Sequence, residues 1–373
     1  MNTRMVQYVL FFCCLFFSFI AARAAPAISA LPKSAACDNY IEKNFPTNGP
    51  AQTHWHICWT EVMGSGLVIQ DVAFSPSPTT PTMSILHDAR LAEIFVPYHD
   101  GEPRFFDITD FEFFLLSLSS RDCPRASRGT LLGNDQTVCQ EIRDRGIAWK
   151  NDDLVKRGEA LVLWSVIDAD NYNYIIEWTF QDDGTILGRV GSTGPKLGGT
   201  DDDRGHMHTF TWRLDMDIAG ADQDSVRVVK HLEIPPALNA RDQLSLVKLE
   251  SGITWNPLEF TTLDIRDKSY TNRNGKNVSY QLKPEKSGTQ RHREAYTKND
   301  FWVTAYNPDE ISPRNLPYYR NRQEVANADV VVWYTAAVHH ETGIRDEDRD
   351  AVPVKWSGFE LAPQNMFERT PFY

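Results

Sequence analysis

Two histidines separated by a single residue, His206 and His208, are the residues of this sequence most suited to chemistry. They begin an alternating run that reaches Ala219, and residues two apart on a strand point to the same side. Phe210 and Trp212 share that side, so both imidazoles should be buried. Because a buried imidazole needs a hydrogen-bonding partner or a metal ion, the pattern predicts either a metal site or two hydrogen-bonded core histidines.

A third imidazole is available at the end of the apolar run from Asp329 to His340. His339 and His340 are neighbours, and neighbours on a strand point to opposite sides, so only one of them can join the other two. Three histidines that leave further coordination positions open are typical of catalytic metal sites. Copper and zinc both suit such ligands, and the spacing does not distinguish them.

The other side of the same histidine run carries carboxylates, at Asp215 and Asp217. Oxygen ligands suit a hard cation such as calcium, whereas imidazoles suit a transition metal. One strand would therefore present a nitrogen site on one side and an oxygen site on the other. The alternative is a solvated acidic surface.

A tyrosine flanked by asparagines, Tyr172, lies between a strand-like run, 161–167, and a second run, 174–180, that alternates as strands do. Asp183-Gly184 marks a tight turn after the second run. We therefore expect Tyr172 and His206-Met207-His208 to lie on neighbouring elements of one sheet. A tyrosine considered alone is usually a core or interface residue.

A carboxylate in aromatic surroundings, Asp107, follows Phe105 and Phe106. Apolar surroundings disfavour the charged carboxylate, so they raise its pKa toward the range of a general base. The alternative for Asp107 is an aspartate that caps a turn.

The elements that must position these residues are short strands separated by turn residues, and no segment shows a sustained helical period. Residues 55–74 indicate two strands joined at Gly64-Ser65-Gly66, and residues 84–97 indicate a further pair of strands. The polar stretch 264–300 is expected to form a long hairpin or arm on the surface, and 111–118 is ambiguous between helix and strand. We predict an all-β fold, most simply a large β-sandwich.

The first 24 residues have the features of a secretory signal peptide. Arg4 precedes the apolar run 9–17, and Ala22-Arg23-Ala24 resembles a cleavage site. Residues 25–50 are expected to be irregular and 51–373 to form one domain. No later run is long and apolar enough to span a membrane.

Four cysteines follow the signal segment, and an even number in a secreted chain indicates disulfides. Pairing Cys37 with Cys58 and Cys123 with Cys139 closes the shortest loops, and two other pairings are possible. Asn277-Val278-Ser279 is a glycosylation acceptor. The formal net charge of -12 argues against nucleic acid and anionic lipid as partners and favours cationic solutes.

Taken in order, these segments resemble the C-terminal catalytic domain of the copper amine oxidases, which make a topaquinone cofactor from one of their own tyrosines. No single motif is decisive; their order and spacing from about Leu91 to Phe372 are. The matching motifs are Ala92-Glu93, Val96-Pro97-Tyr98, Phe106-Asp107, Cys123 to Cys139, Asn171–Tyr174 with Trp178, Asp183–Ile186, Thr193-Gly194, His206–His208 with Arg213–Met216, Asp329–Trp333 leading to His340, and Gly358–Pro363 with Phe367.

The resemblance implies a role for each residue around the cofactor. Tyr172 would be the precursor of topaquinone, and Asn171 would fix its orientation. Asp107 would be the general base, Tyr98 would hydrogen-bond an oxygen of the cofactor, and Phe105 would stand at the gate of the substrate channel. The implied reaction converts a primary amine and O2 into an aldehyde, ammonia and hydrogen peroxide.

The resemblance also implies two metal sites and a homodimer. Copper would be held by three imidazoles, those of His206, His208 and His340. A structural calcium would be held by the carboxylates of Asp215, Asp217 and Asp329 and the carbonyls of Met216 and Val330.

Three features depart from the family pattern. An acid usually follows the cofactor tyrosine, whereas this chain has Asn173. The loop 341–348 is slightly longer than usual, and the two small α/β domains that precede the catalytic domain in the family have no counterpart here. Two alternatives remain open: a secreted β-sandwich that keeps a metal and binds amines or a partner without catalysis, and a zinc hydrolase that uses the three histidines with Asp107 as base.

Overall fold

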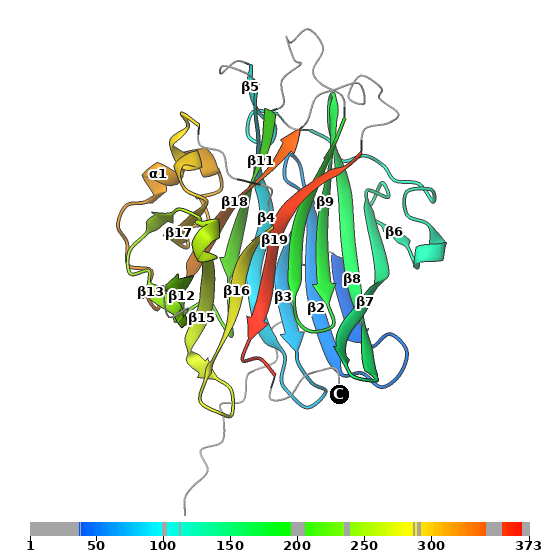
Figure 1. The fold of residues 1–373 in the computed structure, drawn as a ribbon. Helices are drawn as coiled ribbons and strands as arrows, with labels where there is room; N and C mark the ends of the chain where they lie inside the picture. Colours follow the sequence, from blue (N-terminus) through cyan, green and yellow to red (C-terminus); the bar gives the residue numbers. More distant parts are fainter. Residues whose placement is uncertain are drawn as a thin grey trace, which may run out of the picture.

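Two large antiparallel sheets pack face to face in the computed structural model (Figure 1). It describes residues 37, 39–98, 103–111, 113–194, 206–234, 239–285, 288, 292–340 and 353–367. The expected signal peptide, the loop 341–348 and the segment 25–36 lie outside these residues.

The nine-stranded sheet contains His206, His208 and His340. Its order is β1 (Asn39–Phe45), β2 (Thr53–Val62), β3 (Gly66–Ser75), β4 (Met83–Pro97), β11 (His206–Met216), β18 (Val330–His340), β17 (Phe301–Ala305) and β14 (Ser251–Ile253), with β5 (Arg104–Phe106) paired to β4.

The ten-stranded sheet contains the tyrosine. Its order is β13 (Asn239–Leu246), β12 (Asp224–Ile234), β15 (Thr262–Thr271), β16 (Asn277–Glu285), β19 (Lys355–Gln364), β10 (Ile186–Thr193), β9 (Tyr172–Gln181), β8 (Leu154–Ala169), β7 (Val138–Asn151) and β6 (Thr130–Leu132).

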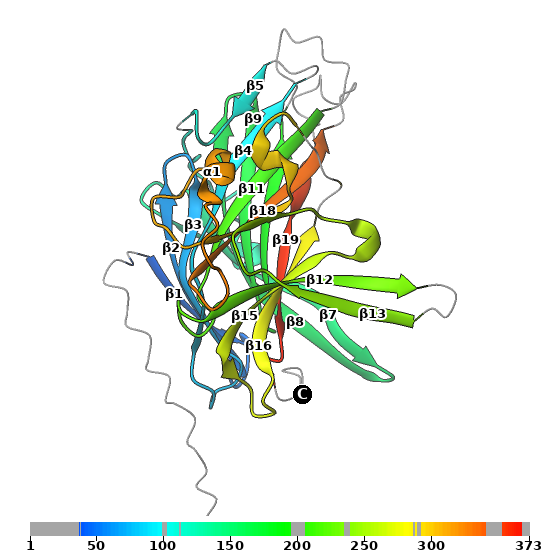
Figure 2. The ribbon, with the colours of Figure 1, turned by 90° about the vertical axis from the view of Figure 1, so that its left-hand side faces the viewer.

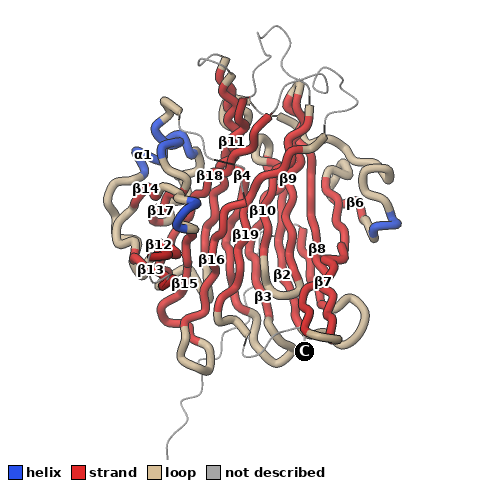
Figure 3. Tube along the Cα trace, in the orientation of Figure 1, coloured by secondary structure: helices blue, strands red, loops and turns tan. Residues whose placement is uncertain are grey.

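Among the described residues, helix is found only as short turns outside the sheets (Figure 3). Four residues form α1 (Leu316–Tyr319), and the 3-10 turns are Arg125–Ser127, Pro257–Glu259, Ala295–Lys298 and Pro313–Asn315. Within the described part of the chain, no helix has the length and hydropathy needed to cross a membrane.

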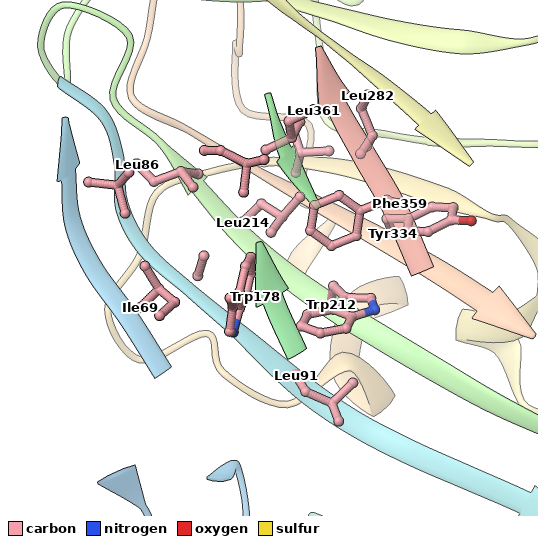
Figure 4. Close-up of a cluster of buried hydrophobic side chains, with 14 of the residues drawn as sticks. Ile69, Leu86, Leu91, Trp178, Trp212, Leu214, Leu282, Tyr334, Phe359 and Leu361 are labelled. Atoms are coloured by element: carbon pink, nitrogen blue, oxygen red, sulfur yellow. The ribbon is translucent and has the colours of Figure 1, made fainter. Parts of the chain in front are cut away.

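The core lies between the two sheets and joins side chains from both. Trp178 on β9 meets Trp212 on β11 with ring centroids 5.1 Å apart, and Phe359 on β19 lies 5.3 Å from Trp212 (Figure 4). All three rings are fully buried. Because strands with one buried face place every second side chain in the core, the alternating pattern confirms the predicted all-β sandwich.

Several elements differ from what the sequence predicts. Residues 83–97 form one continuous strand, not a pair. The described residues of 111–118 form neither a helix nor a strand, apart from a single bridge between Leu115 and Ile167. Part of the segment expected to be irregular, 39–45, is the edge strand β1, which pairs with β2.

The hairpin of β15 and β16 is not a surface arm, because it lies inside the ten-stranded sheet between β12 and β19. The stretch reads as polar, but Ile265 on β15 and Tyr280 and Leu282 on β16 are buried in the core. The hairpin of β12 and β13, by contrast, projects from the sandwich (Figure 2).

Both disulfides are the sequential ones, Cys37 with Cys58 and Cys123 with Cys139. The second ties the loop before β6 to β7.

Candidate functional site

Three imidazoles meet at one end of the nine-stranded sheet. His206 and His208 open β11, and His340 closes β18, the antiparallel neighbour, so that His206 and His340 are directly opposite one another. All three side chains are buried. The register places His339 opposite Met207, and His339 is exposed, so His340 and not its neighbour joins the cluster.

The nitrogens of these imidazoles point at one another. Nε2 of His208 lies 3.2 Å from Nε2 of His206, and Nδ1 of His340 lies 3.3 Å from the same atom. Two nitrogens that bind one ion at about 2.0–2.1 Å with a tetrahedral angle lie about 3.3 Å apart. The donor set therefore fits a copper or zinc ion.

The electrostatics of the cluster favour neutral ligands. Burial, and then the neighbouring imidazoles of His206 and His340, hold the pKa of His208 well below its ordinary value. A neutral imidazole has a lone pair for a metal, whereas a protonated one has none.

Tyr172 reaches the histidines from the opposite sheet, because it begins β9 in the ten-stranded sheet. The expectation that tyrosine and histidines share one sheet is wrong. The chain leaves the ten-stranded sheet after β10 and enters the other sheet at β11, and inward-facing residues alternate in the same way in both sheets.

The hydroxyl of Tyr172 lies 2.9 Å from Nδ1 of His340 and 3.4 Å from Nε2 of His206. Its ring meets the ring of His208 edge-on, at 4.5 Å between centroids and 87°. Only 4% of Tyr172 is exposed. The phenol oxygen thus lies beside the point on which the three imidazoles converge.

A tight turn and a glycine hold Tyr172 in this place. Asp170 and Asn171 form the turn between β8 and β9, with Asp170 at a positive φ of 62°. Gly194, which follows β10, has a φ of +140°, and a Cβ atom there would lie 2.2 Å from the carbonyl oxygen of Asn171 and 2.9 Å from Cα of Tyr172. Only glycine permits this approach.

Asp107 lies just after β5 and is connected to the imidazoles through a second tyrosine. The hydroxyl of Tyr174 donates to Oδ2 of Asp107 at 3.0 Å and lies 3.2 Å from Nδ1 of His208. Sequence reasoning did not assign this role to Tyr174, although its spacing of two residues from Tyr172 puts both on one side of β9.

The pKa of Asp107 is raised to about 7. Burial is the largest cause, the hydrogen bond from Tyr174 lowers the pKa, and the charge of Glu93 raises it. Glu93 is itself fully buried on β4, and its pKa is also raised to about 7 by burial. Its carboxylate accepts from the backbone N–H groups of Ile94 at 3.0 Å and Ile108 at 3.1 Å, so it fixes the turn that carries Asp107.

Aromatic rings lead from the histidines toward the surface. The ring of Tyr98 lies 4.4 Å from that of His206, and the half-buried Phe105 meets Tyr98 edge-on at 5.9 Å. Phe111, 40% exposed, lies 6.3 Å beyond Phe105. The structure therefore brings Tyr98, Phe105 and Asp107 to the same end of the sandwich as the imidazoles.

An acidic cluster lies on the other side of β11. Carboxylate oxygens of Asp215, Asp217 and Asp329 lie within 4.8 Å of one another. Oδ1 of Asp329 has no hydrogen-bonding partner among the described residues, and Oδ2 of Asp215 makes no hydrogen bond there but lies 3.6 Å from Nη1 of Arg213. Such oxygens fit a hard cation.

A fourth carboxylate belongs to this cluster and was missed from the sequence. Asp224, which begins β12, is fully buried, and within the described residues neither of its oxygens has a hydrogen-bonding partner. Its pKa is raised to about 10, mainly by burial and then by Asp217, Asp267, Asp329 and Asp215. The residues that follow Asp224 show no liganding spacing. Its place is revealed by the bridge between Asp224 and Ala328, the residue before Asp329.

Comparisons with known proteins agree with this geometry. The family model "Copper amine oxidase, enzyme domain" matches residues 52–198 and 203–373. The chain is 26% identical over 391 residues to the copper-containing amine oxidase gamma 1 of Arabidopsis thaliana and covers 54% of that protein with 82% of its own length. It is 23% identical to a primary amine oxidase of Pisum sativum, with coverage of 92% of this chain and 65% of that protein.

Among solved structures, a copper-containing benzylamine oxidase from Hansenula polymorpha superposes with a TM-score of 0.72 and 20% identity, over 87% of this chain and 61% of that one. An amine oxidase from Aspergillus nidulans gives a TM-score of 0.68 at 18% identity, over 86% of this chain and 52% of that one. These likenesses show the fold. The chain spans little more than half the length of the first curated relatives it matches.

The family model covers nearly all of the described chain, and the imidazole cluster and the tyrosine lie within the matched residues. The chain therefore belongs to the copper amine oxidase family and carries its enzyme domain.

Proposed function

We propose that this protein oxidises primary amines with molecular oxygen. In the overall reaction R–CH2–NH2, O2 and H2O give R–CHO, NH3 and H2O2. The amine loses two electrons and two protons to O2, and water supplies the aldehyde oxygen. The sequence relatives named as amine oxidases and the family model support this proposal.

Copper and a topaquinone derived from Tyr172 would supply the redox chemistry. His206, His208 and His340 would hold the copper, since they offer three nitrogens with the mutual spacing of one coordination shell. Asn171, in the turn before β9, would keep the ring of Tyr172 in place. The burial of Tyr172 and the three imidazoles excludes bulk water from the reacting atoms.

Asp107 would act as the general base. Its pKa of about 7 leaves a substantial carboxylate fraction at neutral pH while keeping that carboxylate basic. It would take a proton from the carbon that bears the amino group, with Oδ2 held in position by the hydroxyl of Tyr174. Tyr98 would hydrogen-bond the cofactor, and Phe105 would line the entrance for the amine.

One observation carries the proposal: the hydroxyl of Tyr172 comes from one sheet and lies 2.9 Å from an imidazole nitrogen of the other sheet, at the point where three imidazoles converge. A tyrosine with a purely structural role needs one hydrogen-bonding partner. The hydroxyl of Tyr280, for example, donates to the carbonyl of Gly184 and lies away from any metal ligand set.

The test is a matched pair of tyrosine variants. Protein that has been loaded with copper in air should stain for a quinone, react with phenylhydrazine and release hydrogen peroxide with benzylamine or methylamine. Tyr172→Phe should abolish all three signals. It should leave the proposed copper ligands in place, because the three histidines belong to the other sheet. Tyr280→Phe removes an equally buried hydroxyl and should keep all three. Full activity in Tyr172→Phe would refute the role of this tyrosine.

One observation favours a second candidate, a sandwich that binds metal and amines without turnover. Asn173 stands where the family usually has an acid, directly after Tyr172. In such a protein the wild type would bind copper and give no quinone stain, and Asn173→Asp or Asn173→Glu would then restore it.

The oxygens of Asp215, Asp217 and Asp329 would hold a structural calcium, together with the carbonyls of Met216 and Val330. The unpartnered oxygens of Asp224 support a cation here. We also propose secretion and a homodimer, based on the N-terminal sequence and on the family. The Nδ2 atom of Asn277 donates to the carbonyls of Asp267, Lys268 and Tyr270, in the irregular last part of β15. A glycan would replace one hydrogen of this amide, so we do not propose glycosylation there.

A further inference from the structure

A second group of metal-ligating side chains lies on the outer surface of the hairpin formed by β1 and β2. Glu42, His54 and His56 each offer one ligand atom, and these atoms lie within 4.8 Å of one another. The hairpin is the edge of the nine-stranded sheet, and β1 precedes residue 52, where the family match begins. The family match therefore does not account for Glu42.

The pairing of the two strands creates this group. His54 and His56 are two residues apart and point to the same side of β2, away from Trp55 and Ile57, which are fully buried in the core. Glu42 on β1 is directly opposite His56 in the register. Residues opposite one another in an antiparallel pair have Cβ atoms about 4.5–5.5 Å apart, which suits ligands that share one ion.

The side chains already converge. Nδ1 of His56 lies 3.6 Å from Oε1 of Glu42, and the rings of His54 and His56 are 4.3 Å apart at 79°. The hydroxyl of Tyr40 donates to Oε1 of Glu42 at 3.0 Å and also contacts Nδ1 of His56. Oδ1 of Asn44 lies 2.6 Å from Nδ1 of His54, a bond that would orient the ring of a ligand bound through Nε2.

We propose that Glu42, His54 and His56 bind a divalent first-row transition ion, copper or zinc, at a surface site separate from the buried imidazoles. Two imidazoles and one carboxylate suit these ions better than calcium or magnesium, which prefer oxygen ligands. Solvent and the Tyr40 hydroxyl can complete the coordination.

An ion at this site would link β1 to β2. In the described structure β1 pairs only with β2. The two strands are also linked by the disulfide between Cys37, just before β1, and Cys58 on β2. The ion would therefore stabilise the edge of the sheet and would take no part in amine oxidation.

The test measures zinc bound per chain. Protein stripped of metal is dialysed against a buffer that fixes free zinc in the micromolar range, and zinc is counted by mass spectrometry. The double variant His54→Ala/His56→Ala should hold about one ion fewer than the wild type. Glu42→Gln should weaken the site at least about tenfold, because it removes the one anionic ligand. When the double variant is loaded with Cu2+ in place of zinc, it should lack one of the two electron paramagnetic resonance signals of the wild type.

Two controls keep the result specific. His231→Ala removes an exposed imidazole that lies 2.9 Å from a single carboxylate, that of Asp242, and zinc binding should not change. His206→Ala should lose the ion of the buried cluster and keep that of the hairpin, so failure of the proposed function and failure of this site are distinguishable. The same zinc content in the double variant and the wild type, or saturation only at millimolar zinc, would overturn the proposal.

Discussion

At the scale of the residue, Asp107 is set by two neighbours with opposite effects. The hydrogen bond from Tyr174 lowers its pKa, whereas the charge of Glu93 raises it. Burial outweighs both and brings the pKa to about 7. The pKa of this carboxyl is therefore set by two fully buried side chains. Of the two, Tyr174 also contacts His208.

We predict an acidic limb near pH 7 in the pH profile of kcat/KM. A base must be deprotonated, so activity should fall as the pH falls through the pKa of Asp107. Asp107→Asn should lower kcat about 100- to 10,000-fold, as expected for the loss of a general base. Steady-state peroxide release with benzylamine measures both. A wild-type profile that stays flat from pH 5 to 8 would contradict the assignment.

The two neighbours of Asp107 give a sharper test, because their removal should move the limb in opposite directions. Glu93→Gln removes a like charge and should move the limb to lower pH. Tyr174→Phe removes a hydrogen bond to the carboxylate and should move it to higher pH. Limbs that move in the same direction would indicate that Asp107 does not control the profile.

At the scale of the element, the sequence is informative about strands and silent about which sheet a strand joins. The strands β9 and β11 are predicted from their alternation, and β18 from its apolar run. The sequence does not predict that the tyrosine and the histidines lie in different sheets, because inward-facing residues alternate in the same way in either sheet. Tertiary pairing decides it, and this pairing depends on contacts between residues far apart in the chain.

The same limit explains the residues that were missed. Asp224 was missed because its neighbours in space are on β11 and β15, not beside it in sequence. Tyr174 was visible as a core tyrosine, but only the approach of β5 to β9 gives it Asp107 as a partner. The convergence of His206, His208 and His340 could be predicted, because strand periodicity left only His339 as an alternative to His340.

Gly194 provides a prediction about how strands position a side chain. Gly194→Ala puts a Cβ atom 2.2 Å from the carbonyl oxygen of Asn171, so the turn that carries Tyr172 must shift. We expect quinone staining per copper to fall sharply, with a loss of stability of about 1–3 kcal/mol from backbone strain. Copper content should persist, because the ligands are on the other sheet. Staining, metal analysis and thermal unfolding measure the three effects.

The matched control is Gly275→Ala. This glycine also has a positive φ, of 70°, but a Cβ atom there would meet nothing within 4 Å. It should cost stability through backbone strain alone and leave staining at the wild-type level. Equal loss of staining in both variants would show that strain, not the contact with Asn171, is responsible.

At the scale of the whole molecule, the acidic cluster couples stability to pH. The pKa values of Asp215, Asp224 and Asp329 are about 7, about 10 and about 6, all above the value of about 3.9 in an unfolded chain. The folded chain therefore binds more protons than the unfolded chain above about pH 4, so without a cation its stability should fall as the pH rises from about 4 through 7.

We expect calcium to counter this fall. The midpoint of thermal unfolding should decrease between pH 5 and 8 in calcium-free buffer and decrease less in millimolar calcium, because the cation neutralises the carboxylates. Asp224→Asn should raise the midpoint at pH 8 without calcium and reduce the gain from calcium. Asp222→Asn, at an exposed position of the same loop, should change both far less. An unchanged midpoint on addition of calcium at pH 8 would contradict a cation site.

Because the site is divided between two sheets, metal binding and activity can be lost independently. The three imidazoles that we propose as copper ligands lie on β11 and β18, whereas Tyr172 lies on β9 in the opposite sheet. Heat, pressure or a poorly packed core can widen the gap between the layers and leave the ion in its place. A preparation that analyses as fully loaded can therefore be inert, and metal content by itself is a poor assay of quality for this protein.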